Sequence, residues 1–527
     1  MSKKKKRHIK DLKRQITEGN EILRINKKLC IGCTACAFTC SRRTNISVLK
    51  AVDNGKRTVS PKEVTFQNSG CIYCGQCTLM CPTTAIDTTT EQIDKVKQAM
   101  AEGKYMIAIS APAVKATLWE EFGKPIGTDA KGYFEASARK LGFKKVFDTE
   151  FGADVTVVEE STELIKRLSL NENLPMFTSC CPAWVRWMEL YKNEIIPNLS
   201  TVKSPQQIMG AIIKTYYAEK MSLNPKDIFT VAVKPCTAKI YEKDRKNMGR
   251  DEYKDIDAVL TVRQYSSLLK EKDTDLNNLT PEGPDTILGE YTGGAVIFGQ
   301  SSGVGVASLR GAAYYLKDDV SKVNNMQFQD LEGFPGVKTS KVNLGGKDIN
   351  VAIISGIDAA SRLLNTDKWK EFQFIEVMAC PGGCVNGGGT PRILKKSEVS
   401  RKLCIACGTC IQNCPVGAID SVAGGYAKVD AARCVGCALC STLCRSHAIK
   451  MNYFDKANNE MLKESYITLR KNVLLNLDKS IKISVSPENK ELNEMYNTYF
   501  GEVDSAKARE LLHTTYESKS SELTGVK

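Results

Sequence analysis

The chain has 527 residues, 42% hydrophobic and 25% charged, a composition typical of globular proteins and long enough for several domains. Its net charge of +14 favours an acidic partner, but no nucleic-acid-binding motif accompanies the scattered lysines, so no nucleic acid is expected. No run of 18 apolar residues occurs, which argues against a membrane span. No apolar stretch follows the basic residues 1–8, so we expect no secretory signal and a cytoplasmic location.

Cysteine is the unusual residue of this sequence. There are 21 cysteines, and without a secretory signal they are expected to bind metal or take part in chemistry rather than form disulfides. Only three histidines occur, so metal sites built on imidazole are nearly excluded. Ligation by sulfur favours iron–sulfur clusters or structural zinc.

After a basic tail, predicted over 1–24 as a solvated arm or a short docking helix, two cysteine runs define a domain predicted over 25–92. Each run reads C-x2-C-x2-C-x3-C, typical of two-cluster ferredoxins, in which the fourth cysteine of each run binds the cluster of the other. Structural zinc would need paired C-x2-C knuckles instead. The long interval between the runs contains Asn54-Gly55, a turn signal, and predicts a loop or hairpin. The two [4Fe–4S] ligand sets are Cys30, Cys33, Cys36 and Cys81, and Cys71, Cys74, Cys77 and Cys40.

A second pair of such runs predicts another two-cluster ferredoxin-like domain over 396–455. The same crossing rule gives two further [4Fe–4S] ligand sets. They are Cys404, Cys407, Cys410 and Cys444, and Cys434, Cys437, Cys440 and Cys414.

Between these two units, strand-like and helix-like segments alternate, which predicts an α/β domain over 93–395. The expected helices cover 115–122 and 159–168. The expected strands cover 106–110, 145–147, 154–158, 176–179, 229–233, 258–261 and 351–354.

Three more cysteine motifs lie in this region: TSCCPAW (178–184), PCTAKIYE (235–242) and EVMACPGGCVNGGG (376–389). Neighbouring side chains of an extended chain point in opposite directions, so one of Cys180 and Cys181 can bind metal while the other stays free. Five glycines surround the last cysteine pair and allow the backbone to approach a bulky cofactor. Four ligands for one further cluster are available, and with Cys180 they account for every remaining cysteine: Cys181, Cys236, Cys380 and Cys384.

These three motifs resemble those of the [FeFe] hydrogenases, over roughly 25–395 and again over 456–527, so the second ferredoxin-like unit is interpreted as an insertion. The resemblance implies an α/β catalytic domain with two lobes of mixed sheet flanked by helices and an H-cluster between them. That cofactor is a [4Fe–4S] cubane joined through one cysteine sulfur to a two-iron unit carrying CO, cyanide and an azadithiolate. The implied cubane ligands are Cys181, Cys236, Cys380 and Cys384, with Cys384 bridging to the two-iron unit.

The resemblance also implies roles for residues around the cluster. Cys180 is the implied proton-donating thiol, and Lys239 and Pro112 are implied to hold a cyanide ligand. Glu160, Glu163 and Arg167 share one helix face. That pattern alone fits a solvated face, but the resemblance assigns them, with Ser200, to a proton relay. The implied cavity lining is Ala113, Gln206, Lys234, Pro235, Phe298, Met378 and Gly383.

The predicted function is the reversible conversion of two protons and two electrons to H2, with electrons relayed through four accessory [4Fe–4S] clusters. Expected partners are ferredoxin or a similar acidic electron carrier, and maturation enzymes that load the H-cluster. Three departures from the usual motifs, Ala113, Lys234 and Thr390, indicate a divergent subclass. The alternatives are a hydrogen sensor, a non-catalytic electron-transfer or cluster-assembly protein, and a subunit of a bifurcating complex.

Overall fold

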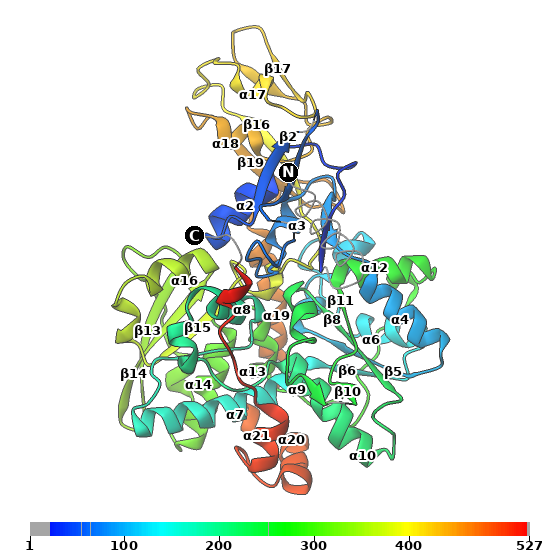
Figure 1. Ribbon diagram of the computed structural model, residues 1–527, viewed down its shortest axis with the longest axis vertical. Coiled ribbons are helices and arrows are strands. Elements are labelled where there is room, and N and C mark those ends of the chain that lie inside the picture. Colours follow the sequence, from blue (N-terminus) through cyan, green and yellow to red (C-terminus); the bar gives the residue numbers. More distant parts are fainter. Residues whose placement is uncertain (1–21, 54, 64, 251, 524–527) are drawn as a thin grey trace, which may run out of the picture.

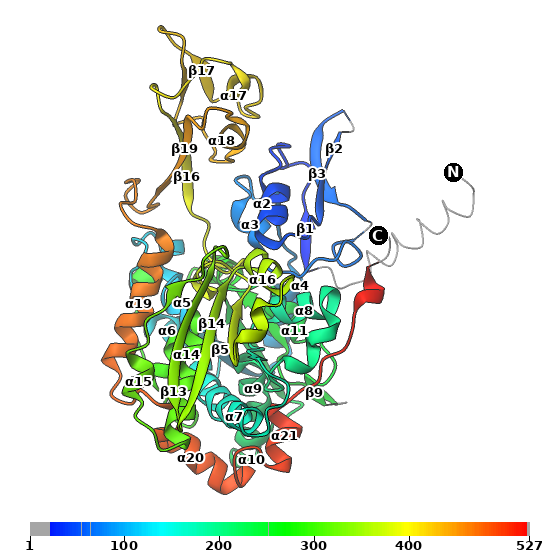
Figure 2. The ribbon, with the colours of Figure 1, turned by 90° about the vertical axis from the view of Figure 1, so that its left-hand side faces the viewer.

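The computed structural model describes residues 22–53, 55–63, 65–250 and 252–523. A large body of sheets and helices forms one end of the molecule, and two small cysteine-rich modules extend from it (Figures 1 and 2). Most of the predicted N-terminal tail lies outside the described residues. Its last two positions, Leu23 and Arg24, belong to strand β1 (Leu23–Ile25) instead.

The first module contains both N-terminal cysteine runs. Strand β1 pairs antiparallel with β4 (Ile86–Thr88). Helix α2 (Ala35–Thr44) contains Cys36 and Cys40 of the first run, and helix α3 (Gln76–Met80) contains Cys77 of the second run and ends directly before Cys81. A hairpin of β2 (Leu49–Asp53) and β3 (Arg57–Pro61) occupies the interval between the runs, as predicted.

The first sheet of the large body has four strands in the order β11-β8-β5-β6, and every neighbouring pair is parallel. Parallel sheets are covered on both faces, which explains the continuous apolar runs of these strands. The structure confirms the predicted strands here: β5 (Tyr105–Ser110), β6 (Lys145–Asp148), β8 (Ile228–Lys234) and β11 (Ala258–Thr261).

The second sheet has five strands in the order β12-β13-β14-β15-β7. It is mixed, because β14, β15 and β7 run parallel while β12, β13 and β14 run antiparallel. Its strands are β7 (Met176–Phe177), β12 (Gln329–Asp330), β13 (Val337–Leu344), β14 (Lys347–Ser355) and β15 (Phe374–Met378).

One predicted strand, 154–158, is wrong. It lies inside helix α7 (Thr149–Leu170), which also contains the predicted helix 159–168. Val155, Val157 and Val158 are all fully buried, so this part of α7 is apolar on more than one face. A short apolar run cannot be assigned to a strand or a buried helix from periodicity alone. The predicted helix 115–122 is divided into α5 (Pro112–Lys115) and a 3-10 helix (Leu118–Phe122).

The second module begins and ends on one two-stranded ladder, in which β16 (Leu394–Val399) pairs antiparallel with β19 (Ile449–Phe454). The module thus leaves the large body and returns to it at neighbouring positions (Figure 2). Within it lie α17 (Thr409–Gln412), α18 (Leu439–Leu443), β17 (Ile419–Ser421) and β18 (Ala427–Val429).

The C-terminal segment returns along the large body through α19 (Tyr466–Ser480), α20 (Lys490–Met495) and α21 (Ala506–Leu512) (Figure 1). Arg470 of α19 is fully buried and donates to both carboxylate oxygens of Glu120, each at 2.7 Å. Within the described ranges, no helix combines the length and apolar character needed to cross a bilayer.

Candidate active site

The candidate site is a cavity at the carboxyl ends of parallel strands from both sheets. Strand β5 leads into Pro112, β8 into Cys236 and β15 into Cys380, and the segment after β7 supplies Cys180 and Cys181. Strand carboxyl ends are the usual binding edge of α/β folds. The centre of a water molecule can reach about 90 Å³ of this cavity.

All five cysteines of the three motifs line this one cavity, although they come from separate parts of the sequence. Burial is the main cause that raises the pKa of Cys236 to about 11, and the charge of the neighbouring Cys181 adds to the increase. Burial is also the main cause that raises the pKa of Cys384 to about 12, with smaller contributions from Cys236 and Cys181. A positive metal centre would relieve this repulsion between thiolates, so the donor set fits a cluster ligated by sulfur.

A second observation also fits a bound group. Gln206 lines the cavity, and its Oε1 atom is buried without a hydrogen-bond partner among the described residues. Its Nε2 donates to the Lys239 carbonyl oxygen at 3.3 Å, which fixes the amide beside the cavity. A buried polar atom without a partner is costly, and a ligand in the cavity could supply one.

The glycines of the third motif fall into two groups. Gly383 has φ of 97°, a conformation that favours glycine, and an added Cβ would lie 2.5 Å from the Ser301 nitrogen. Gly388 instead packs against the first module, where a Cβ would lie 2.4 Å from the Cys74 carbonyl oxygen. The glycine triplet therefore permits close backbone packing between the large body and the first module, a role the sequence analysis did not foresee.

The other residues predicted to line the site also border this cavity: Pro112, Ala113, Gln206, Lys234, Pro235, Lys239, Phe298, Met378 and Gly383. Thr390 does not border it. Its hydroxyl donates to the Gly387 carbonyl oxygen at 2.9 Å and so holds the glycine loop.

The two lysines of the cavity, Lys234 and the partly buried Lys239, have different surroundings. Lys239 Nζ lies 2.8 Å from the Glu242 carboxylate and 3.1 Å from the Cys180 carbonyl oxygen. Burial alone would lower the pKa of Lys239, but Glu242 outweighs it, so the pKa is raised. Lys234 donates to the Thr149 hydroxyl, and burial together with Lys239 lowers its pKa to about 7.

The residues predicted as a proton relay lie next to one another. Burial raises the pKa of the Cys180 thiol, and the negative charge of the nearby Glu160 on α7 is the second largest cause of the increase. Burial raises the pKa of Glu160 itself to about 7. Ser200 donates to Glu163 at 3.1 Å, and Arg167 binds the same carboxylate at 2.6 Å.

Two hydroxyl groups that the sequence analysis missed join this group. Ser308 donates to Glu160 at 2.9 Å, and Thr201 donates to Glu163 at 3.2 Å. Neither residue lies in a recognisable motif, and Ser308 comes from α14 (Gly303–Tyr315), far along the chain from α7. No sequence signal could have identified them.

The cysteine runs of both modules also cross in space. One cavity of the second module is lined by the first three cysteines of one run and the fourth of the other: Cys404, Cys407, Cys410 and Cys444. In the first module, burial raises the pKa of Cys36 to about 12, and the charge of Cys81, the fourth cysteine of the other run, adds most to this increase after burial. In the same way, burial raises the pKa of Cys71 to about 12, and Cys40 of the other run adds most to it after burial.

Comparison with protein families gives four matches along the chain. Residues 104–388 match the iron only hydrogenase large subunit, C-terminal domain, and residues 464–519 match the iron hydrogenase small subunit. Residues 29–85 and 397–451 each match a 4Fe-4S dicluster domain.

Individual relatives agree with these matches. The chain is 34% identical to iron hydrogenase 1 of Clostridium pasteurianum over 512 residues, 96% of this chain and 78% of that protein. It is 38% identical to the periplasmic [Fe] hydrogenase large subunit of Nitratidesulfovibrio vulgaris, over 66% of this chain and 92% of the relative. The solved apo [FeFe]-hydrogenase HydA1 from Chlamydomonas reinhardtii matches with a TM-score of 0.61 and 29% identity, over 80% of this chain and 99% of that structure. The chain therefore belongs to the iron-only, or [FeFe], hydrogenase family.

Proposed function

We propose that this protein interconverts two protons and two electrons with H2, and that the cysteine-lined cavity holds the H-cluster. The observation that carries this proposal is the convergence of all five motif cysteines on one buried cavity beside Glu160. The bound cluster would supply the metal centre at which H2 is formed or split. The proposed ligands are Cys181, Cys236, Cys380 and Cys384.

The surrounding residues would orient the cofactor and supply protons. The ammonium group of Lys239 is held beside the cavity by Glu242 and can bind an anionic ligand such as cyanide. Apolar side chains such as Phe298 and Met378 exclude water from the cavity. Cys180 is the one cysteine of the three motifs outside the proposed ligand set, so its thiol can exchange a proton with the site and with the nearby Glu160.

The deciding experiment is infrared spectroscopy of protein made with H-cluster maturation enzymes, together with an H2 assay using reduced methyl viologen. CO and cyanide bands with H2 evolution are expected. Bands with negligible turnover would favour a hydrogen sensor. Iron–sulfur clusters without bands would favour an electron-transfer or assembly protein, as the 28% identity to the cytosolic Fe-S cluster assembly factor narfl of Xenopus tropicalis illustrates.

We propose that the four accessory [4Fe–4S] sites form a single line toward the cavity. Cys74 of the first module lines the active-site cavity itself, which supports its cluster as the nearest one. The two sites of the first module are also neighbours. Burial raises the pKa of Cys77, a proposed ligand of one site, and the charge of Cys36, a proposed ligand of the other, adds to the increase. Short separations of this kind are what electron transfer between clusters requires.

The two modules meet at a pair of cysteines. The Cys437 side chain lowers the pKa of Cys33, and Cys33 in turn raises the pKa of Cys437. Lys395 of β16 lies at the same contact, with its Nζ 3.5 Å from the Met80 sulfur. This contact supports the second module as the outer part of the line, ending at the cavity lined by Cys407.

The outer end of this line has the features of a docking surface for ferredoxin or a similar acidic carrier. Leu403 and Ile405 are 54% and 64% exposed beside the exposed Cys407. Arg401, Lys402 and Arg445 are exposed around them, and none of the three is ion-paired within the described part of the chain. Apolar side chains ringed by cations suit an acidic partner with an apolar centre.

Reversing the charges of Arg401 and Lys402 is expected to lower H2 evolution driven by reduced ferredoxin at low salt by about tenfold, because charge complementarity sets the association rate. Turnover with methyl viologen should stay within twofold, since this small dye does not need the surface. Substitution of Leu170, which is 57% exposed at the end of α7, with glutamate is the control for an added surface charge. Equal losses with both electron donors would contradict the proposed docking surface.

Lys234 is expected to tune the cofactor, because its cationic form in the cavity would stabilise a more negative, reduced cluster. Lys234→Met removes that charge and should shift the midpoint potential of the H-cluster to a more negative value. Infrared titration of the CO and cyanide bands against applied potential measures the shift. An unchanged potential would refute this role.

The proposed domain boundaries are 25–92, 93–395, 396–455 and 456–527, after a tail over 1–24, with the two sheets of the catalytic domain as the two lobes around the cavity. Each of the four family matches falls within one of these ranges, which supports the division.

A further inference from the structure

The proposed relay leaves one step open, which is how Glu163 exchanges protons with water. Arg167 cannot do so, because a guanidinium keeps its protons at any ordinary pH. Both of its terminal nitrogens are also engaged: they donate to Glu163 at 2.6 Å, to the Leu199 carbonyl oxygen at 2.7 Å and to three further carbonyl oxygens. Arg167 therefore anchors Glu163 and is not a carrier.

A second chain of hydrogen bonds leaves Glu163 in another direction. The Thr201 hydroxyl donates to Glu163 Oε2 at 3.2 Å and lies 2.8 Å from His513 Nδ1. A hydroxyl can donate one proton while it accepts another, and an imidazole can gain or lose a proton near neutral pH. Thr201 and His513 thus have the chemistry and the spacing to extend the relay by two groups.

This branch ends at water. Thr201 and His513 both line an open cavity of about 460 Å³ between the segment after α21 and the neighbouring loops. The His513 side chain is 9% exposed and that of Glu163 is 13% exposed, but of the two only His513 lines this cavity. The charged residues that border the cavity around His513 are Lys203, Arg250, Asp255, Arg509 and Glu510.

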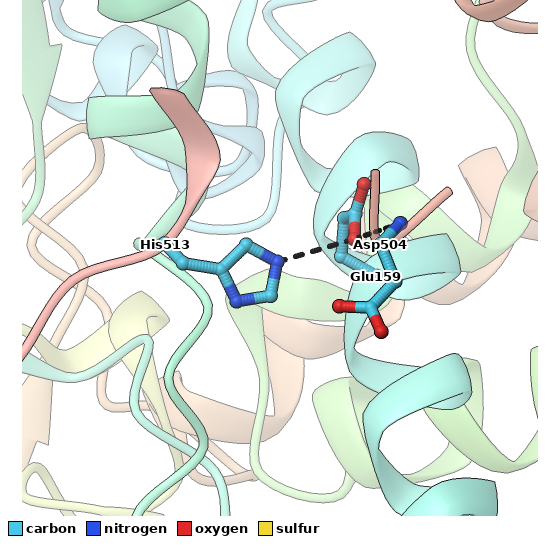
Figure 3. A group of neighbouring side chains, drawn as sticks. All are labelled: Glu159, Asp504 and His513. Carbon is cyan, nitrogen blue, oxygen red and sulfur yellow. Dashed lines mark hydrogen bonds and ion pairs between the residues drawn. The ribbon is translucent and has the colours of Figure 1, made fainter. Parts of the chain in front are cut away.

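The far side of the ring is held by α7. His513 Nε2 lies 3.2 Å from Glu159 Oε2, which also accepts from the Asp504 nitrogen at 3.0 Å (Figure 3). The other carboxylate oxygen, Oε1, accepts from the Tyr496 hydroxyl at 2.5 Å. Glu159, Asp504 and His513 are close enough to suggest a metal site. Hydrogen bonds already account for this arrangement, since the Asp504 carboxylate is also paired with Arg509 at 2.6 Å.

We propose that His513 and Thr201 carry protons between the water of this cavity and Glu163. In the inward direction, imidazolium His513 gives its Nδ1 proton to the Thr201 oxygen as the Thr201 hydroxyl proton moves to Glu163. The neutral ring then takes a proton from water in the cavity, so no net charge stays on Thr201. This inference rests on the proposed hydrogenase activity and adds the outlet to its relay.

The test compares variants of the loaded enzyme with methyl viologen as the electron donor. His513→Gln keeps a polar group beside Thr201 but cannot carry a proton, and it should lower kcat for H2 evolution by about tenfold. Added imidazole should restore most of that loss by entering the open cavity. Thr201→Val should cause a similar loss, while Thr201→Ser, which keeps the hydroxyl, should retain nearly full activity.

Glu510→Gln is the matched control, because it changes a charge at the same cavity without touching the hydrogen-bonded chain. Unchanged CO and cyanide bands and an unchanged unfolding midpoint in His513→Gln would exclude a purely structural effect. Full turnover in His513→Gln, or a loss that imidazole does not restore, would overturn the inference and favour direct exchange at Glu163, whose side chain is 13% exposed. A wild-type enzyme without turnover would overturn the proposed function, and the inference with it.

Discussion

Replacing Cys180 with serine is expected to lower H2 turnover by about 10³-fold while leaving the CO and cyanide infrared bands in place. Serine keeps nearly the same size, but its hydroxyl holds a proton far more tightly than a thiol, whose reference pKa is about 8.5. A positioned proton donor typically accounts for about 10²- to 10⁴-fold in rate. Because Cys180 lies outside the proposed ligand set, the cofactor should still bind.

Infrared spectra and methyl viologen-linked H2 evolution, recorded on the same preparation, measure both parts of this expectation. Cys181→Ser is the contrast, because it removes a proposed cluster ligand next in sequence and should lose the bands together with the activity. Turnover above about one tenth of wild type in Cys180→Ser would mean that protons reach the cluster by another group.

Replacing Arg470 with methionine is expected to destabilise the large body by about 3–5 kcal/mol, because it leaves the buried Glu120 carboxylate without a partner. Arg470 is fully buried and binds Glu120 twice at 2.7 Å. Its other nitrogen donates to the Val385 carbonyl oxygen at 2.8 Å, directly after the proposed ligand Cys384. The change should therefore loosen α19 and the loop that carries the ligand together.

Urea denaturation followed by tryptophan fluorescence provides the measurement, read as a shift of the first transition because several domains unfold in this chain. A second variant, Arg470→Met with Glu120→Leu, removes both charges and should recover most of the stability. Arg433→Met is the exposed control, since its partner Asp420 is well exposed and such pairs contribute little. A single variant as stable as wild type would show that the buried pair is not needed.

The sequence alone determined the chemistry of this protein, because the informative residues are close together along the chain. Four cysteines within eleven residues specify a cluster run, whatever surrounds them. The three further motifs contain Cys180 and four candidate ligands, and their resemblance to the [FeFe] hydrogenases agrees with the family to which the chain belongs. The strands of the parallel sheet were also predictable, because each is a short apolar run.

Only the tertiary structure decided the features that depend on contacts between distant segments. Residues 154–158 form a helix because packing surrounds them on all sides, and no local pattern records that burial. The glycine triplet packs on the first module, and Cys33 meets Cys437 across about 400 positions of sequence. The same holds for the hydrogen bonds from Glu163 through Thr201 to His513, since the bonded residues are 38 and 312 positions apart and meet only after the chain has folded.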